Sequence, residues 1–580
     1  MQIRSDLLLP LIRIDQHRRL DFLDFSGKPL TWFVIGLILH TIGLIYVHFS
    51  PDSMHFVDLG RNFARGLGLV TYSQNLTSES IPDWITFFPP LYPVLLSIGF
   101  KLEMGAAGAA RIVSLTSFVI IFLSVYAFGR RLVSRELGVL ATALWVILVS
   151  RWSISLYAWS DPPFIAFSLL SLLVMMKSLQ KEEHLVYYFA LAGLLSGLAA
   201  STRLIGVTLL PCGILAAILS AFRSDRDRKR LWCAVKLTAA LLIGFIVPMS
   251  TWMIYNRVMA GYFMKALRIP SETSLFTNVA TMAKGIFFDL WPVFALTLMT
   301  YLLVGGLSLK GFLSYFPGKG RLSEGLRKDI LLIMSCWIIC YCGLLIVIAS
   351  IVDIYDMRYL NTRLFVPVYP FLIVILSAVA YLAYSLKFSM PRVPRSVYAA
   401  FFLAALALAG KHLLWEVELT KKYDFGSYEL YQWIAKETEP DDLFVGYEAW
   451  HICFYTGRPV LESGYPEMPR LTPEAVTAFL KRFEADYNNA YYVLIMEKGE
   501  RFSPKDLRLY SRAGFDLRPC GVFDSYLKEV EVYRIMRIDQ ETISPSLSEP
   551  SQAQTRFEES YPTLDELSLS LISIAFRLTE

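Results

Sequence analysis

The sequence predicts a polytopic α-helical membrane protein with about eleven transmembrane helices, followed by a small external α/β domain. Apolar residues make up 55% of the 580 residues and aromatic residues 14%. The mean hydropathy of +0.46 is well above that of a soluble enzyme of this length. Apolar runs of about the 20 residues needed to cross the hydrocarbon recur through the first 415 positions. Together these observations exclude a soluble globular class.

The predicted spans follow from the apolar runs taken in order. They are 31–49, 108–128, 137–152, 160–178, 186–202, 204–222, 232–255, 288–309, 329–351, 364–386 and 396–415. We expect the further run 90–103 to lie along the outer surface, because counting it as a span would put the next loop on the wrong side of the membrane.

Basic loops set the predicted orientation. Four short loops rich in Arg and Lys all fall on one side in the eleven-span arrangement: 129–136, 222–231, 310–328 and 387–395. Basic loops stay on the cytoplasmic side of a membrane, so the N-terminus is predicted to be cytoplasmic and the chain after the last span external. The net charge of +5 is small for the length, and no nucleic-acid partner is expected.

These assignments divide the chain into four predicted parts: a cytosolic N-terminus (1–28), a transmembrane catalytic domain (29–415), an external α/β domain (416–540) and a mobile tail (541–580). Within the third part, 443–446 and 491–495 have strand patterns, whereas 428–436 and 473–483 have helical ones. We expect this domain to act as a lid or as a module that docks the acceptor.

Two acidic residues lie where a membrane protein rarely places charge. Asp52 follows the first span, in the external loop 50–90, and Asp161 closes the external loop 152–161. Ionisable groups at a bilayer boundary are costly, so a convergent pair indicates a functional site. Two simpler explanations stay open: Asp52 is a solvated flank of the span, or Asp161 caps the helix that begins there.

Several cations are predicted at the same boundary, where they can bind a lipid phosphate or simply reach the head groups. They are Arg111, Arg203, Arg257, Lys265, Arg268, Lys284, Arg358 and Arg363. Asp52, His55, Asp58 and Asp161 have side chains that bind divalent metals, but their spacing is not diagnostic, so metal dependence stays open. His55 is otherwise expected at the surface and Asp58 in a structural role.

The order of these motifs resembles the GT-C glycosyltransferases, in particular the protein O-mannosyltransferase, aminoarabinose transferase and RgtA-like group. The resemblance rests on Asp52-Ser53, the segment 65–68 (Arg-Gly-Leu-Gly) and the segment 89–93 (Pro-Pro-Leu-Tyr-Pro). It continues through Arg111, Asp161, Arg358-Tyr359 and Val366-Pro367, and covers most of residues 30–370. The chain departs from the family at Ser53, where many relatives have a glutamate.

The resemblance implies transfer of a sugar from a polyprenyl-phosphate donor to an acceptor hydroxyl on the external face, with inversion at the anomeric carbon. It implies that Asp52 is the base and that Asp161 shares this role or orients a cation or the acceptor. Residues that bind the donor or its phosphate are then expected among Arg111, Arg203, Lys284, Arg358, Tyr359 and Tyr92. The acceptor is a lipid, glycan or protein, and the surrounding lipids are also partners.

Two other classes stay open on the sequence alone. A lipid or sugar transporter or flippase is also polytopic with intramembrane charge, although the two halves show no obvious internal repeat. A non-catalytic scaffold that kept the fold would tolerate loss of Asp52. The short N-terminus and the few cysteines favour a bacterial inner membrane.

Overall fold

The computed structural model describes residues 28–75, 83–84, 88–147, 157–263, 274–290, 324–351, 362–385, 428–462, 491–496 and 515–537, with short gaps, and single positions between 407 and 418. The predicted spans 288–309 and 396–415 lie almost entirely outside these residues, as does the predicted helix 473–483.

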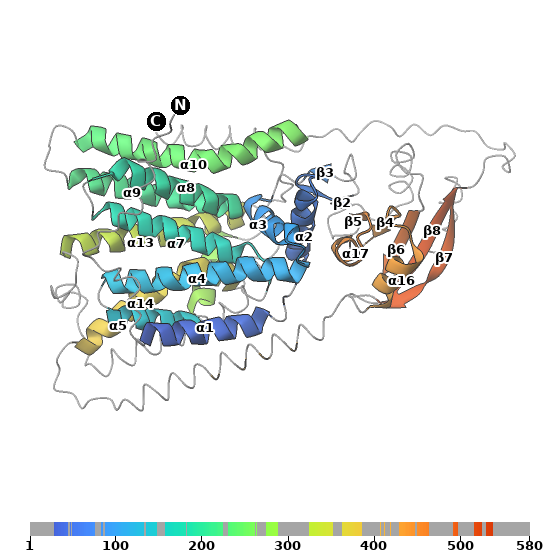
Figure 1. Cartoon of the computed structure of the whole chain (residues 1–580), viewed down its shortest axis with the longest axis horizontal. Helices are drawn as coiled ribbons and strands as arrows, with labels where there is room; N and C mark the ends of the chain where they lie inside the picture. Colours follow the sequence, from blue (N-terminus) through green and yellow to red (C-terminus); the bar gives the residue numbers. More distant parts are fainter. Residues whose placement is uncertain are drawn as a thin grey trace.

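A bundle of roughly parallel and antiparallel helices forms the larger part of the molecule (Figure 1). Its helices are α1 (Lys28–Leu44), α4 (Ala106–Leu132), α5 (Arg135–Ile147), α7 (Asp161–Ser178), α8 (Leu185–Thr202), α9 (Leu209–Phe222), α10 (Arg230–Ala260), α13 (Glu324–Ile351) and α14 (Tyr369–Ser385). Within the described residues, six helices are long and apolar enough to cross a membrane. A helical integral membrane protein is thus confirmed, and the count of eleven spans stays a prediction.

The run 90–103 forms a short helix, α3 (Leu91–Lys101), of 11 residues. At a rise of 1.5 Å per residue it is about 16 Å long, well short of the ~30 Å hydrocarbon core. It packs against α2 (Pro51–Ala64), and both lie at one end of the bundle (Figure 1). Its length agrees with the expectation that this run does not span the membrane.

The two ends of the bundle carry different charged residues. Asp161 begins α7 and Arg203 follows the last residue of α8, so both lie at the end that carries α2 and α3. At the opposite end, α4 finishes with Arg130 and Arg131. Arg223 there forms an ion pair with Asp329 at the start of α13. These described basic residues, from the loops 129–136 and 222–231, therefore lie away from the acidic pair.

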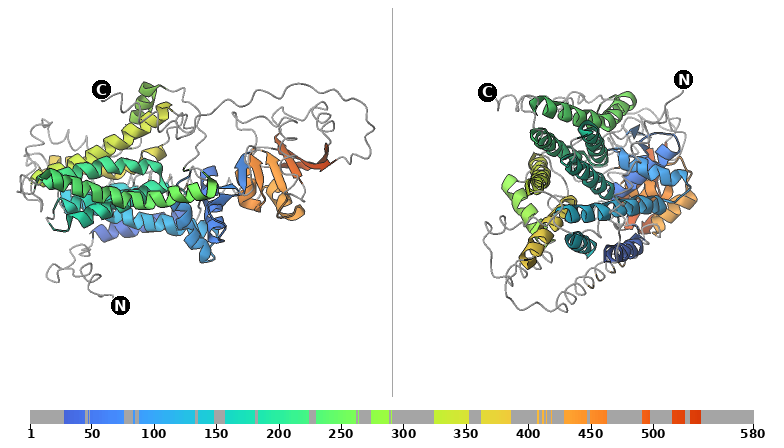
Figure 2. Two further views of the ribbon diagram at one scale, coloured as in Figure 1. Left: turned by 90° about the horizontal axis from the view of Figure 1, so that it is seen from above. Right: turned by 60° about the vertical axis from the view of Figure 1, so that its left-hand side comes forward.

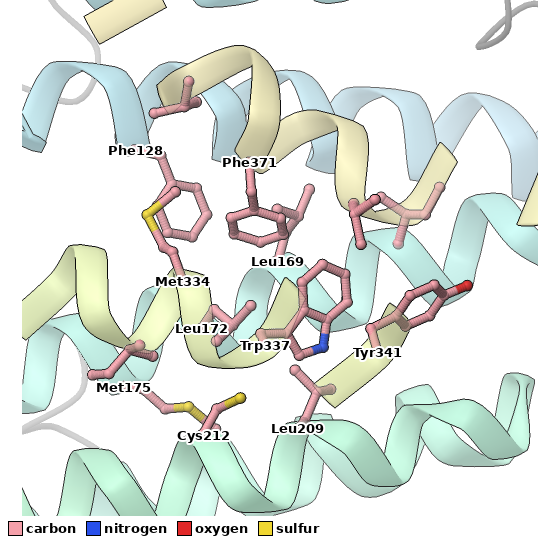
Figure 3. Close-up of a cluster of buried hydrophobic side chains, with 14 of the residues drawn as sticks. Phe128, Leu169, Leu172, Met175, Leu209, Cys212, Met334, Trp337, Tyr341 and Phe371 are labelled. Atoms are coloured by element: carbon pink, nitrogen blue, oxygen red, sulfur yellow. The ribbon is translucent and has the colours of Figure 1, made fainter. Parts of the chain in front are cut away.

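Large apolar side chains form the bundle core, and Figure 3 shows the part where α4, α7, α9, α13 and α14 meet. Trp337 of α13 packs against Phe371 of α14 with ring centroids 4.8 Å apart, and Phe128 of α4 lies 5.3 Å from Phe371. Leu169 of α7 and Leu209 of α9 complete the cluster. Lipid is as apolar as these side chains, so close van der Waals packing stabilises such a core.

Glycines let α8 and α10 approach closely. A Cβ at Gly193 would overlap the carbonyl oxygen of Leu241, and one at Gly244 would overlap that of Ala190. Gly197 faces Phe245 of α10 in the same way. Small residues four apart let membrane helices approach until their backbones touch. This contact holds the end of α8, and with it Arg203, against its neighbours.

A six-stranded mixed sheet lies beyond the end of the bundle (Figures 1 and 2). Its order is β2 (Ser73–Asn75), β5 (Val460–Glu462), β4 (Leu443–Gly446), β6 (Tyr491–Met496), β8 (Glu529–Arg537) and β7 (Phe515–Asp524). The first four are parallel, and β8 pairs antiparallel with both β6 and β7. Helices α16 (Glu429–Glu437) and α17 (Ala449–Thr456) accompany it. The strands predicted at 443–446 and 491–495 and the helix predicted at 428–436 are confirmed.

One strand of this sheet comes from a distant part of the chain. β2 belongs to the first external loop, pairs with β5 and is extended by a hydrogen bond from the Val460 amide to the Tyr72 carbonyl, 3.0 Å. The short hairpin of β1 (Val70–Thr71) and β3 (Asp83–Trp84) lies in the same loop. The sequence did not predict that the first loop contributes a strand to this sheet, because a run of three residues is too short to show a strand pattern.

Helix α2 lies between the bundle and the sheet. Met54 is buried in an apolar cluster with Leu430 and Phe444 from the C-terminal elements, whereas Phe56 packs against Tyr92 of α3. His55, expected at the surface, is in fact 3% exposed because α17 covers it with the ring of Trp450. The expectation was wrong because the covering helix lies almost 400 residues away in sequence.

The close contact between α8 and α10 predicts that Gly244→Leu destabilises the fold. The added side chain has no space beside the backbone of Ala190, so the helices must separate, at a cost of about 1–3 kcal/mol. The measurement is the thermal unfolding midpoint in detergent. Gly343→Ala on α13 is the control, because a Cβ there meets nothing within 4 Å and the helix gains from alanine. Equal midpoints for Gly244→Leu and wild type would contradict the described packing.

The burial of His451 predicts that the folded protein becomes less stable in mild acid. Burial in α17 lowers its pKa to about 4, below its ordinary value of 6.5. Between these values the unfolded chain binds a proton that the folded chain does not, so stability falls as the pH drops from about 6.5 to about 4. The slope approaches about 1.4 kcal/mol per pH unit. Unfolding midpoints at pH 7.5 and 5 should differ less in His451→Gln than in wild type, whereas the exposed His184→Gln should leave the difference unchanged.

Candidate active site

The first carboxylate of the site is carried by the N-terminal turn of α2. Ser50 caps the helix by accepting a hydrogen bond from the Ser53 amide at 3.3 Å, and Pro51 occupies the first helical position. Such a start is favoured because proline lacks an N–H that would otherwise go unpaired. Asp52 follows with its side chain 45% exposed. Ser53 is buried and shares a 3.0 Å hydrogen bond with Ser50 Oγ.

The second carboxylate, Asp161, is fully buried at the first turn of α7. Its Oδ1 accepts from Arg203, and its Oδ2 accepts from Arg363 Nε at 3.1 Å. The residue at the cap position is Ser160, which makes no side-chain capping bond. Both oxygens of Asp161 are therefore engaged by guanidinium groups, and a helix cap does not account for the residue.

Arg363 joins the two carboxylates. Besides the bond to Asp161, its Nη1 donates to Asp52 Oδ2 at 3.2 Å, although the two residues are 311 positions apart. Burial alone lowers the pKa of Arg363, but the charges of Asp161 and Asp52 outweigh it, so the net pKa shift is upward. The guanidinium thus stays charged and holds both acids in one place.

The full cluster contains two carboxylates and two guanidinium groups, and its formal charge is zero. Opposite charges at these distances offset part of the cost of burying each one. Arg363 also lies over the Trp159 ring, with Cζ 3.6 Å from the ring centroid. Among the described residues, nothing binds Oδ1 of Asp52. One carboxylate oxygen therefore remains accessible at the edge of an otherwise paired cluster.

The structure brings three of the predicted site residues together: Asp52, Asp161 and Arg203. Tyr92 is buried on α3 against Phe56 of α2, and burial together with the Asp161 charge raises its pKa. Arg111 donates from Nε to the Leu44 carbonyl at 2.6 Å and so attaches α4 to the end of α1.

The other predicted donor-binding residues are less informative. Lys284 is exposed on the helix 275–287. Arg358, Tyr359, Lys265 and Arg268 lie outside the described residues, and their roles stay predictions.

The four residues considered for a metal do not gather. Asp58 is buried in α2, where it accepts from Thr71 Oγ1 at 2.6 Å and from Asn62 Nδ2 at 3.2 Å. Burial raises the pKa of Asp58, and these hydrogen bonds oppose the rise. It therefore attaches the first loop to α2, as expected for a structural residue. The part of the chain that the structure describes contains no group of three His, Cys, Asp or Glu side chains placed to bind a metal.

Arg363 is the residue that sequence reasoning undervalued. It was one of eight cations at the outer boundary, and Arg358 was preferred because of its place in the family pattern. The available signal was position: Arg363 directly precedes the predicted span 364–386, whereas Arg358 lies six residues before it. Trp159, two residues before Asp161, was not selected either.

Comparison with known proteins finds a similar family and a similar fold. A family model described as dolichyl-phosphate-mannose-protein mannosyltransferase matches residues 88–254, from just before α3 into α10. The matched range includes Asp161 and Arg203. A search by sequence finds no match among curated proteins.

Among solved structures, apo ArnT from Cupriavidus metallidurans aligns with a TM-score of 0.55 and 13% identity, covering 87% of this chain and 97% of that chain. ArnT from the same organism bound to undecaprenyl phosphate aligns at 0.52 with 14% identity and the same coverage. The apo oligosaccharyltransferase of Archaeoglobus fulgidus aligns at 0.46 with 14% identity, covering 85% and 73%.

The chain has the GT-C glycosyltransferase fold. The recognition made from the sequence is thereby confirmed. This chain thus shares its fold with ArnT, and its residues 88–254 match the mannosyltransferase family model. The charged cluster joins the first turns of α2 and α7, and α2 lies between the bundle and the sheet (Figure 1).

The buried ion pairs predict that Asp161→Asn strongly lowers the stability of the fold. The amide cannot neutralise Arg203 and Arg363, and breaking a buried pair by changing one partner costs about 3–5 kcal/mol. The unfolding midpoint should fall clearly. Asp516→Asn is the matched control, since its partner Arg518 is exposed and such pairs contribute at most about 1 kcal/mol. A midpoint for Asp161→Asn close to that of the control would show that the described pairs do not form.

Proposed function

We propose that the protein transfers a sugar from a polyprenyl-phosphate donor to an acceptor hydroxyl at the external face of the membrane, with inversion. The observation that carries the proposal is the cluster in which Arg363 binds Asp52 and Asp161 at one end of an apolar bundle. A donor of this kind keeps its tail in lipid while its phosphate and sugar reach the boundary, so the reacting groups are needed at a bundle end.

Asp52 is the proposed base. It accepts the proton of the acceptor hydroxyl while the hydroxyl oxygen attacks the anomeric carbon and the bond to the phosphate oxygen breaks. The Asp52 side chain is 45% exposed and no described residue binds its Oδ1, whereas Asp161 is fully buried with both oxygens engaged, which supports Asp52 as the base. Asp161 is then the residue that orients the two arginines.

Arg203 and Arg363 are the proposed binding groups for the departing phosphate. The phosphate gains negative charge as the bond breaks, and preorganised guanidinium groups stabilise that charge most where water is scarce. Arg203 donates to the carboxylates through Nη1, and Arg363 donates through Nε and Nη1. The other N–H groups of each guanidinium can then donate to a ligand. Their side chains are 20% and 16% exposed, so they remain reachable.

The proposed orientation puts this end of the bundle outside. Basic residues at the opposite end, such as Arg130 and Arg223, support a cytoplasmic location for that end. The C-terminal sheet is then external, and a bacterial inner membrane fits the sequence. A divalent metal is not needed for the proposed steps, since the arginines carry the phosphate charge.

The test is transfer from a panel of polyprenyl-phosphate sugars by the purified protein. Asp52→Asn should lower the turnover rate by about 10²–10⁴-fold, because a general base contributes that much, while the unfolding midpoint stays near that of wild type. Asp516→Asn, an exposed carboxylate on β7, is the matched control and should keep full activity.

Three results would contradict the proposal. Full activity of Asp52→Asn would remove Asp52 as the base. Retention of anomeric configuration in the product would exclude a single displacement. Movement of the intact lipid-linked sugar across a vesicle membrane, with no transfer, would favour the transporter or flippase class.

A further inference from the structure

We infer that Trp159 is a positioning residue whose indole holds the Arg363 guanidinium and the first turn of α2 in one arrangement. The inference rests on the proposed function and adds to it the side chain that sets the geometry of the reacting groups. Its basis is that Trp159 contacts both partners by different parts of one rigid ring.

The two faces of the indole are both occupied. Arg363 Cζ lies 3.6 Å from the ring centroid, and the Tyr157 ring is stacked at 4.2 Å with an interplanar angle of 11°. Two groups at such distances cannot share one face, so the indole lies between them. A cation over an aromatic face is attracted by the ring quadrupole, most strongly on tryptophan. The stack therefore fixes the plane of the guanidinium.

The edge of the indole reaches the other partner. Trp159 Nε1 donates to Ser50 Oγ at 2.7 Å, and the same Ser50 oxygen caps α2 by accepting from the Ser53 amide. Asp52 is the second residue of that helix. The indole edge thus holds the helix start that carries the proposed base, while its face holds the cation that binds this base.

This arrangement distinguishes Trp159 from a platform that stacks on the sugar. Such a platform needs an open aromatic face, and both faces of Trp159 are covered. Its contribution is therefore to the placement of Asp52 and Arg363. Because a misplacement of about 1 Å can cost about 10²-fold in rate, a loosened stack should lower turnover strongly.

The first experiment compares Trp159→Leu and Trp159→Phe in the full-length protein. Trp159→Leu loses both contacts, so kcat should fall about 10²-fold with little change in the KM for the acceptor. Trp159→Phe keeps an aromatic face and loses the N–H, and should recover about a tenth of the wild-type kcat. Trp252→Leu, which removes a buried tryptophan from α10, is the matched control for lost packing and should keep kcat. Equal losses in Trp159→Leu and Trp252→Leu would overturn the inference.

A second experiment tests the bond to Ser50. Trp159→Phe and Ser50→Ala each remove the same hydrogen bond, so the double variant should be little slower than the slower single variant. If the two losses instead multiply, the residues act independently and the indole does not hold the helix start.

A third measurement does not depend on catalysis. Trp159→Leu and Arg363→Lys should be non-additive in the shift of the unfolding midpoint, because each disrupts the same stack. Additive shifts would overturn the positioning role of Trp159 even if sugar transfer is normal. If the shifts are non-additive but the wild-type protein transfers no sugar, the indole–guanidinium contact stands and the proposed function fails. The role of Trp159 in catalysis is then overturned as well.

Discussion

The arrangement depends on one guanidinium group shared by two carboxylates. Arg363 joins α2 to α7 through Asp52 and Asp161, and Asp161 extends the link to Arg203 after α8. Each of these charges would be costly to bury alone, and together they sum to zero. A neutral cluster can therefore lie at the end of an apolar bundle, within reach of the proposed lipid-linked donor.

The C-terminal elements are part of this arrangement. Met54 of α2 lies in their apolar cluster, Trp450 covers His55, and β2 from the first loop is an edge strand of their sheet. On its other side α2 packs against α3 through Phe56 and Tyr92. The helix that carries Asp52 is thus held from both sides. Of the two roles expected from the sequence, a lid or a module that docks the acceptor, a lid that moves away from the first loop would need to break the β2–β5 pairing.

Much of the architecture could be predicted because membrane crossing imposes strong patterns. Apolar runs located α4, α7, α8 and α9 to within a few residues, and the cost of charge at a boundary singled out Asp52 and Asp161. Other features depend on contacts between distant segments. The place of Arg363 directly before a predicted span is only a weak signal among eight boundary cations, because its contacts with Asp52 and Asp161 join distant segments. The burial of His55 likewise requires knowing that α17 covers α2.

The most direct measurement is an experimental structure of the protein in lipid nanodiscs at a resolution that defines side chains. The account predicts the Arg363 guanidinium within hydrogen-bonding distance of both the Asp52 and the Asp161 carboxylates, with the Trp159 indole against its face. A structure in which Arg363 points into lipid, or in which the two carboxylates lie in separate crevices, would contradict it.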